Sequence, residues 1–398
     1  MKIMMTRENL GRMLKGVSYA VAKRATMPAM ENVEIGPTQA GDYIRAFCGM
    51  TGCAIEIRMP GLVLEGGKAI VRLDPLQKFV DACKGSADVT LTRNDDNTLL
   101  VECGKSKLKL NGFDEKASPR SLFLGFGEPQ DGETVFSMRN GDFLSGVRSV
   151  SCIAGKELED ARANTKGLHI SASTDGLVSF AATDGRRLAE AVKGCQGDAD
   201  KAQSEPEKPC EGTVPSGSVA VLSGMLAWAS PSDLVRVAMS DGNMMLSSEN
   251  WTCSMSLMAE KFVDYSRLLP MDGYATKVIL PRQQFLESLK RVMLMSMDND
   301  TPNVRISVDN QGTCLLEAEG KTGSAKDSFE CECDENGVPY CDGAVKAKFN
   351  GAFLTDVLPN ADFGDGGVVM RYKSEVEPIH ILASDDSFHY VLMPMRDN

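Results

Sequence analysis

Residues 143–150 read Phe-Leu-Ser-Gly-Val-Arg-Ser-Val, and residues 285–292 read Phe-Leu-Glu-Ser-Leu-Lys-Arg-Val. Residues 13–20, Met-Leu-Lys-Gly-Val-Ser-Tyr-Ala, follow the same arrangement. In all three stretches, apolar residues stand at i, i+1, i+4 and i+7, which puts them along one stripe of an amphipathic helix. The three stretches therefore predict equivalent helices of a threefold internal repeat.

Each of these helices has a companion further along the chain, and short strands lie between the two. Apolar residues recur at helical spacing in residues 76–80, 225–228 and 353–358. Helical segments are predicted at 7–24, 74–84, 139–156, 222–233, 282–291 and 346–358. Alternating or β-branched residues predict strands at 89–92, 168–172, 178–180, 304–308, 368–372 and 379–382. We therefore expect an α+β fold with two helices and antiparallel sheets in each of three similar domains.

Glycine and proline clusters near 125–132 and 264–276 mark the expected domain boundaries. The predicted domains are 1–128, 129–270 and 271–398. The middle domain is lengthened by residues 194–213, which are polar, carry two prolines and lack periodicity. This stretch is predicted to be a loop insertion on the surface.

The composition is that of a globular protein, with 42% hydrophobic residues in a chain of 398. No apolar run approaches the roughly 20 residues of a membrane-spanning helix. The first residues contain no apolar stretch of signal-peptide length. The twelve cysteines include no Cys-x-x-Cys pair and are expected to be reduced thiols. These features predict a cytoplasmic protein without a membrane partner.

Charge is distributed unevenly between helices and the rest of the chain. The net charge is −12, yet the predicted helical segments hold fifteen basic and seven acidic residues. A cationic helical face on an acidic protein attracts phosphate locally while the remaining surface repels it. The alternative is that helices simply tolerate Lys and Arg well.

The motifs of common enzymes are incomplete in this sequence. Gly104-Lys105-Ser106 and Gly320-Lys321-Thr322 resemble half of a phosphate-binding loop, but leucines occupy the positions of the required upstream glycine. No serine lies in a Gly-x-Ser-x-Gly elbow, and there are only three histidines. We therefore expect neither catalysis nor an obligatory cofactor.

A structural zinc site is also not expected. Cys331, Cys333 and Cys341 offer three soft ligands, whereas such sites usually have four. The aromatic residues are scattered and form no base-stacking motif. A cationic face without a base-reading element is expected to hold nucleic acid through its backbone, without sequence specificity.

Three further strings carry a resemblance to a known family. They are Ala-Thr-Asp-Gly-Arg-Arg-Leu-Ala at 182–189, Lys-Phe-Val-Asp-Tyr-Ser-Arg-Leu-Leu-Pro at 261–270, and Tyr-Val-Leu-Met-Pro-Met-Arg at 390–396. In this order they resemble the bacterial-type DNA sliding clamp, the beta subunit of DNA polymerase III. The resemblance covers the whole chain and is weakest in residues 30–130. It implies a head-to-tail dimeric ring whose helices line a hole for double-stranded DNA.

The resemblance implies that the three strings converge on one apolar pocket. In the family this pocket receives short peptides of the Gln-Leu-x-Leu-Phe type from the replicative polymerase, the clamp loader and repair proteins. Carried over position by position, the pocket comprises Thr165, Thr183, Gly185, Arg187, Leu188, Val263, Arg267, Leu268, Phe353, Val391, Met393, Pro394, Met395 and Arg396. Leucine and valine members would form an apolar floor, and the methionines can repack around different partners.

The resemblance also implies a DNA face and a dimer interface. The residues expected to face DNA are Lys15, Lys23, Arg24, Lys78, Lys84, Arg148, Lys156, Arg282, Lys290 and Arg291. The expected dimer interface pairs Leu108 and Leu110 of one chain with Leu294 and Met295 of the next. Closure into a ring would also cover an open sheet edge.

The chain departs from the family pattern in a few places. Arg186 stands where histidine is frequent, Val263 stands where proline is common, and Asp397 and Asn398 replace an apolar last residue. These departures bear on which partners bind. The expected function is a processivity factor that tethers a polymerase to DNA. Two alternatives remain: a clamp-fold competitor or inhibitor of a host replisome, and a nucleic-acid-modifying enzyme with an atypical site.

Overall fold

The structure is a computed structural model of the 398-residue chain. It describes residues 1–22, 27–41, 43–83, 85, 88–123, 126–127, 133–154, 165–195, 205–269, 273–274, 276–297, 299, 301–364 and 366–396. The chain divides into two compact units. The first unit contains residues 1–141, 196–210 and 221–257, and the second contains residues 142–195, 211–220 and 258–398.

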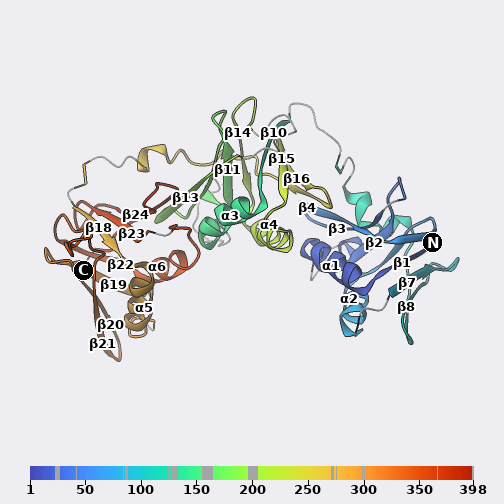
Figure 1. The fold of residues 1–398 in the computed structure, drawn as a ribbon, viewed down its shortest axis with the longest axis horizontal. Coiled ribbons are helices and arrows are strands. Elements are labelled where there is room, and N and C mark those ends of the chain that lie inside the picture. The colour runs from blue at the N-terminus through green and yellow to red at the C-terminus, as the bar shows by residue number, and fades with distance from the viewer. Residues whose placement is uncertain are drawn as a thin grey trace. The chain divides into compact units, whose positions relative to one another are not determined.

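The first unit begins with sheet A and the helices α1 and α2 (Figure 1). Sheet A has the order β5 (Leu62–Glu65), β1 (Lys2–Thr6), β7 (Asp88–Arg93), β8 (Leu99–Cys103) and β9 (Ser106–Leu110). Helix α1 (Arg7–Val17) begins where the Thr6 hydroxyl accepts a hydrogen bond from Asn9 N (3.2 Å). The apolar stripe of α1 is buried, and α1 contacts α2 (Leu73–Ala82).

Sheet B joins strands from the first and second thirds of the sequence. Its order is β10 (Thr134–Arg139), β15 (Leu234–Ser240), β16 (Asn243–Ser248), β17 (Trp251–Ser256), β4 (Cys53–Pro60), β3 (Tyr43–Met50), β2 (Asn32–Pro37) and β6 (Ala69–Arg72). The junction is the antiparallel pairing of β17 with β4, in which Cys253 lies opposite Ile55. Trp251 and Ile57 are also paired there, and both are buried.

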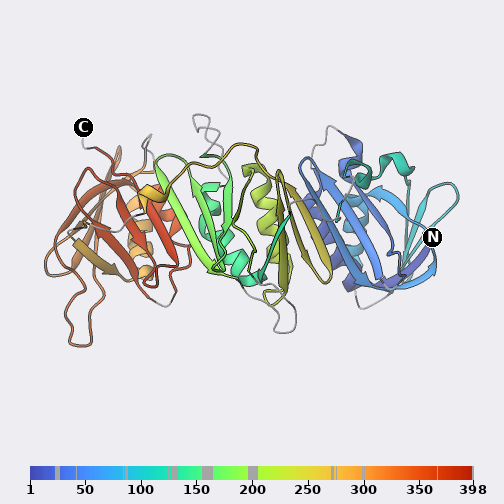
Figure 2. The same ribbon diagram turned by 90° about the horizontal axis from the view of Figure 1, so that it is seen from above.

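Sheet C of the second unit repeats this plan with strands from the second and last thirds. Its order is β14 (Cys210–Val214), β11 (Leu168–Ala172), β12 (Leu177–Thr183), β13 (Arg187–Gly194), β25 (Phe388–Leu392), β24 (Ile379–Leu382), β23 (Val368–Tyr372) and β18 (Thr276–Leu280). Figure 2 shows the green strands continuing into the red strands as one sheet. Helix α3 (Asn140–Ala154) packs on it through Phe143, whose ring meets that of Phe180 edge-on at 5.1 Å.

Sheet D completes the second unit. Its order is β21 (Gly323–Glu330), β20 (Thr313–Gly320), β19 (Asn303–Val308) and β22 (Val345–Asn350). Helix α5 (Arg282–Met293) packs on β19, β20 and β21, and it also contacts α6 (Gly351–Val357). Helix α4 (Ser216–Trp228) spans the division of the chain, since its residues belong to both units.

The six predicted strands all occur, and each predicted helical segment overlaps a helix. Several helix boundaries were wrong, since α1 ends at Val17 and not at 24, and α4 ends at Trp228 and not at 233. Helix α4 begins at Ser216, before the predicted 222, and residues 346–350 belong to strand β22 instead of a helix. The alternation of buried Val345, Ala347 and Phe349 with exposed or half-buried residues is a strand pattern, and Asn350 then caps α6.

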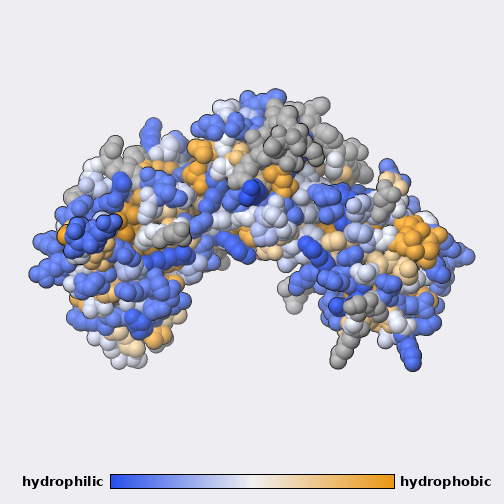
Figure 3. Space-filling view, in the orientation of Figure 1, coloured by the Kyte–Doolittle hydropathy of each residue, from blue (hydrophilic) through white to orange (hydrophobic). Residues whose placement is uncertain are grey.

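The middle third contributes to both compact units because its outer strands, β17 and β13, pair with strands of the first and last thirds. The boundaries 1–128, 129–270 and 271–398 stay a prediction. The insertion 194–213 lies partly outside the described residues. Hydrophilic residues cover most of the face seen in Figure 3, with apolar residues in small separate patches. Within the described residues, no helix is long and apolar enough to cross a membrane.

Candidate functional site

The turn between β12 and β13 presents the first of the pocket strings. The Thr183 hydroxyl donates to the carbonyl of Arg187 (2.8 Å) and accepts from Gly185 N (3.2 Å). Gly185 has a φ of +83°, a conformation that strains any residue with a Cβ. The Thr-Asp-Gly sequence therefore builds a tight turn that leads Arg187 and Leu188 onto sheet C.

Arg187 lies beneath this turn, with its side chain only 1% exposed. Its guanidinium pairs with Asp184 (Nε to Oδ2, 2.9 Å) and with Asp356 (Nη1 to Oδ2, 3.2 Å). It also lies over the Phe353 ring at 4.1 Å. A buried cation held by two carboxylates fixes the turn against α6. The direct peptide contact expected for Arg187 stays a prediction.

The floor of the candidate site is the pairing of β13 with β25. Leu188 lies directly opposite Val391, and both are largely buried. The neighbouring Tyr390 hydroxyl donates to the Phe353 carbonyl (3.2 Å), which ties α6 to the same sheet. Burial raises the pKa of Tyr390 well above its ordinary value, so this hydroxyl remains protonated and able to donate. Apolar residues from distant parts of the sequence thus share one row of sheet C.

The second string, residues 261–270, is held against sheet C by two of its own aromatic residues. The Phe262 ring stacks on His169 at 4.7 Å with an interplanar angle of 5°. The Tyr265 hydroxyl donates to Glu190 Oε1 (2.9 Å), and burial together with this carboxylate raises the pKa of Tyr265. These contacts hold the segment that carries Val263, Arg267 and Leu268. Leu268 is 51% exposed, which suits a side chain that meets a ligand.

The terminal string follows directly from β25. Met393 N donates to the Arg186 carbonyl (3.0 Å), and Met395 N donates to the Lys348 carbonyl (2.7 Å). The tail therefore runs from the turn at Arg186 to strand β22. Met393 is 48% exposed and remains available to a ligand. Pro394 and Arg396 continue this edge.

The second unit thus connects most of the predicted pocket through named contacts. Hydrogen bonds, ring contacts and strand pairing link the turn, the β13–β25 floor, Phe353 and the tail. The segment 261–269 lies on the same sheet. Thr165 lies in a turn ahead of β11 and stays a predicted member.

The chain is similar to known proteins over its full length. It is 25% identical to the beta sliding clamp of Pseudomonas aeruginosa over 397 residues, which cover 98% of each chain. It superposes on the crystal structure of the DNA polymerase III subunit beta of the same organism with a TM-score of 0.83 and 21% identity, covering 100% of both chains. The sliding clamp of Bacillus subtilis gives a TM-score of 0.83 at 16% identity, again over both whole chains. No family model matches the chain. The chain has the beta sliding clamp fold.

Within this clamp fold, the residues predicted for the dimer interface lie at element ends and edges. Leu108 and Leu110 are half-buried on β9, the last strand in the order of sheet A. Leu294 follows α5 and is 69% exposed. Met295 comes next. Its carbonyl lies so close to residue 320 that a Cβ on residue 320 would clash with it, so glycine is required at position 320.

The cations predicted to face DNA differ in exposure and in pairing. Lys15, Arg148 and Lys290 are exposed on helices α1, α3 and α5, and Lys78 on α2 is exposed but pairs with Asp74 (2.8 Å). Arg291 is exposed but pairs with Asp327 (2.6 Å). Lys23, Arg24, Lys84 and Lys156 lie outside the described residues.

Arg282, also predicted to face DNA, is half-buried at the start of α5 and bound to carbonyl groups. Its Nε and Nη2 donate to the Leu358 carbonyl (3.0 and 2.8 Å), and Nη2 also donates to the Ala361 carbonyl (3.0 Å). Its guanidinium lies over Phe363 at 5.3 Å. These contacts satisfy carbonyl groups after α6, so Arg282 is a structural residue of the clamp fold and not one of the exposed cations.

No cluster of three or more His, Cys, Asp or Glu side chains suited to a metal ion occurs in the part of the chain that the structure describes. Sequence reasoning missed several residues that build the pocket. Asp184 precedes Arg187 by three residues, and this spacing within a turn was a visible signal. Asp356 and Glu190 carried no such signal, because their partners are far away in the sequence.

Proposed function

We propose that this protein is a DNA sliding clamp, in which two chains close head to tail around duplex DNA. The full-length similarity to beta sliding clamps and the clamp fold support this proposal. The exposed cations of α1, α2, α3 and α5 are suited to phosphate contacts without base reading. Retention would then depend on the closed ring, and weak, salt-sensitive contacts are sufficient for sliding.

The candidate pocket on sheet C would tether protein partners, namely the replicative polymerase and the clamp loader. The observation that carries this part is the opposition of Leu188 and Val391 on a sheet whose flanking segments expose Leu268 and Met393. Leu268 and Met393, from the second and third family strings, are exposed, and the buried Leu188 and Val391 would form the floor beneath a short peptide. The cationic DNA face and this pocket need no catalysis and no cofactor of the protein's own. Such a factor would work in the cytoplasm, at the DNA.

Ring closure would use β9 of one chain and the end of α5 of the next. An edge strand offers backbone groups to a partner, and the exposed Leu294 offers apolar area. A head-to-tail contact that closes after two copies satisfies both edges at once. The active form would therefore be a homodimer.

The first test is the binding of a fluorescent Gln-Leu-x-Leu-Phe peptide to the wild-type protein and to Leu188→Lys. We expect binding near 1 μM, about −8 kcal/mol, for the wild type. The variant should lose it, because a charge would enter the apolar floor. Leu177→Lys, an exposed leucine at the start of β12, serves as the matched control. No binding by a folded dimer would contradict the tethering part of the proposal.

Primer extension separates the proposal from a competitor or an inhibitor. A loaded clamp should lengthen the products of its polymerase on a primed circular template, whereas an inhibitor would shorten those of a host polymerase. DNA turnover by the purified protein alone would instead indicate an enzyme. Equal product lengths with and without the loaded protein would overturn the processivity role.

A further inference from the structure

The face of sheet D that points away from α5 carries a row of cations. Arg305 on β19 lies directly opposite Lys348 on β22, and the next pair on this face is Ser307 with Lys346. Ile306, which lies between these two positions on β19, is buried on the side of the helices. Side chains alternate between the two faces of a strand, so the cations lie on the face opposite α5.

These cations line a hollow of about 300 Å³ that reaches the C-terminal tail. Four cationic side chains and one carboxylate contribute to it, in a protein with a net charge of −12. We call it the basic groove; it is lined by Arg305, Lys346, Ala347, Lys348, Glu375, Val376, Met395 and Arg396. The exposed Val376 (74%) adds an apolar wall.

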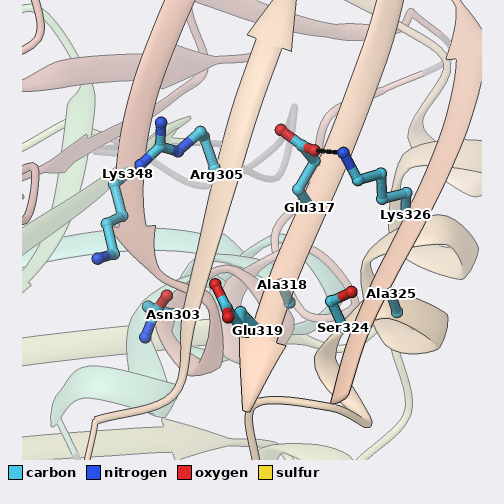
Figure 4. A pocket seen from close by; sticks show the side chains of 9 residues that line it. All are labelled: Asn303, Arg305, Glu317, Ala318, Glu319, Ser324, Ala325, Lys326 and Lys348. Carbon is cyan, nitrogen blue, oxygen red and sulfur yellow. Dashed lines mark ion pairs between the residues drawn. The ribbon is translucent and has the colours of Figure 1, made fainter.

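A second hollow, of about 340 Å³, continues the basic groove across sheet D (Figure 4). Arg305 and Lys348 line both hollows. Figure 4 shows these two side chains on neighbouring strands at one side and the Glu317–Lys326 ion pair at the other. The positive charge is therefore concentrated at the end that meets the tail.

The tail connects the basic groove to the candidate peptide pocket. Met393 is hydrogen-bonded to the turn at Arg186, and Met395, two residues later, is hydrogen-bonded to Lys348. A peptide that occupies the pocket beside Met393 therefore needs only a few more residues, at roughly 3.3 Å each, to reach the basic groove. The two surfaces share one edge.

We propose that the basic groove binds an acidic segment flanking the docking peptide of a protein partner. This inference rests on the proposed function, because the docking peptide must occupy the pocket. A groove with four cations and one carboxylate favours Asp and Glu over neutral residues. DNA is the less suitable ligand. The helices, including α5, are the elements proposed to face DNA, and the basic groove lies on the opposite face of sheet D. Arg305 and Lys348 also interact within the chain, so an acidic segment would add to or replace those interactions.

The test compares two labelled peptides with the same Gln-Leu-x-Leu-Phe core, one flanked on both sides by Asp-Asp-Glu and the other by Ser-Ser-Gln. We expect the acidic peptide to bind the wild-type protein about tenfold more tightly in 0.1 M salt. The difference in affinity between the acidic and the neutral peptide should disappear in 1 M salt, where the Debye length is about 3 Å. The variant Lys346→Gln/Lys348→Gln should lose the preference and still bind the neutral peptide normally.

The matched control is Lys277→Gln/Lys321→Gln, which removes the same charge from exposed positions of the second unit that line neither hollow and should keep the preference. Equal affinity of both peptides for the wild type overturns the basic groove and leaves the tethering function intact. Binding of neither peptide overturns both proposals. A loss of duplex-DNA affinity in Lys346→Gln/Lys348→Gln, with the peptide preference unchanged, would assign these lysines to nucleic acid and contradict the inference.

Discussion

Leu188 in β13 and Val391 in β25 lie directly opposite each other, although they come from distant parts of the chain. Their pairing brings the turn at 183–187 and the C-terminal tail to one surface. The buried Arg187 holds this arrangement through Asp184 and Asp356. The candidate pocket therefore depends on ion pairs beneath its surface as well as on the apolar residues that would contact a peptide.

Replacing Arg187 with methionine should destabilise the protein by about 3 kcal/mol, because the change leaves two partly buried carboxylates without their cation. The free energy of unfolding in urea measures this effect. Arg186→Met is the matched control, since Arg186 is the exposed neighbour in the same turn, and it should stay within about 0.5 kcal/mol of the wild type. Similar losses in the two variants would argue against the ion-pair role.

The double substitution Leu294→Glu/Met295→Glu should convert dimers into monomers, because charge at the end of α5 opposes burial against a partner. Multi-angle light scattering should then give the mass of one chain. Leu177→Glu changes another exposed leucine and should leave the dimer intact. A dimer that persists in the double variant would place the interface elsewhere.

Removing the charges of Lys15, Arg148 and Lys290 by substitution with glutamine should weaken duplex binding. The slope of log affinity against log salt should become shallower by about 0.9 for each phosphate that the protein no longer neutralises. Binding to short duplexes between 50 and 200 mM salt measures the slope. Lys373→Gln, in an exposed ion pair with Glu377, is the control and should not change it. An unchanged slope in the triple variant would mean that the cationic face lies elsewhere.

Because His380 is buried, we expect the protein to lose stability as the pH is lowered. Burial, with nearby His389 and Arg371, lowers the pKa of His380 to about 4, below its ordinary 6.5. The unfolded chain therefore binds more protons between pH 6.5 and 4, so stability falls as pH falls through this range. The full effect is about 2 to 3 kcal/mol.

The free energy of unfolding in urea should change less between pH 7 and pH 4.5 for His380→Gln than for the wild type. His169→Gln should remove less of it, since burial lowers the pKa of His169 while Glu211 opposes the shift. An undiminished difference in His380→Gln would assign the acid sensitivity to other groups.

Local pattern was sufficient for much of the fold. The i, i+4, i+7 spacing located α1, α3 and α5, because an apolar stripe of that period can be buried only on a helix. Alternation located strands such as β11 and β19 for the corresponding reason. The segment 346–350 was misassigned because its alternating residues run directly into the apolar residues of α6, and the Asn350 cap between them was overlooked.

The site depended on the tertiary structure. The three strings could be compared with a family, yet only strand pairing sets Leu188 against Val391, and only folding brings Asp356 to Arg187. Likewise, Arg282 and Lys290 are both cations of α5, but one is bound to carbonyl groups and the other is exposed. The periodicity of apolar residues indicates which face of a helix or strand is buried, because the residues of one face lie close together in the sequence. The partner of a buried charge depends on interactions between distant segments, which no local pattern contains.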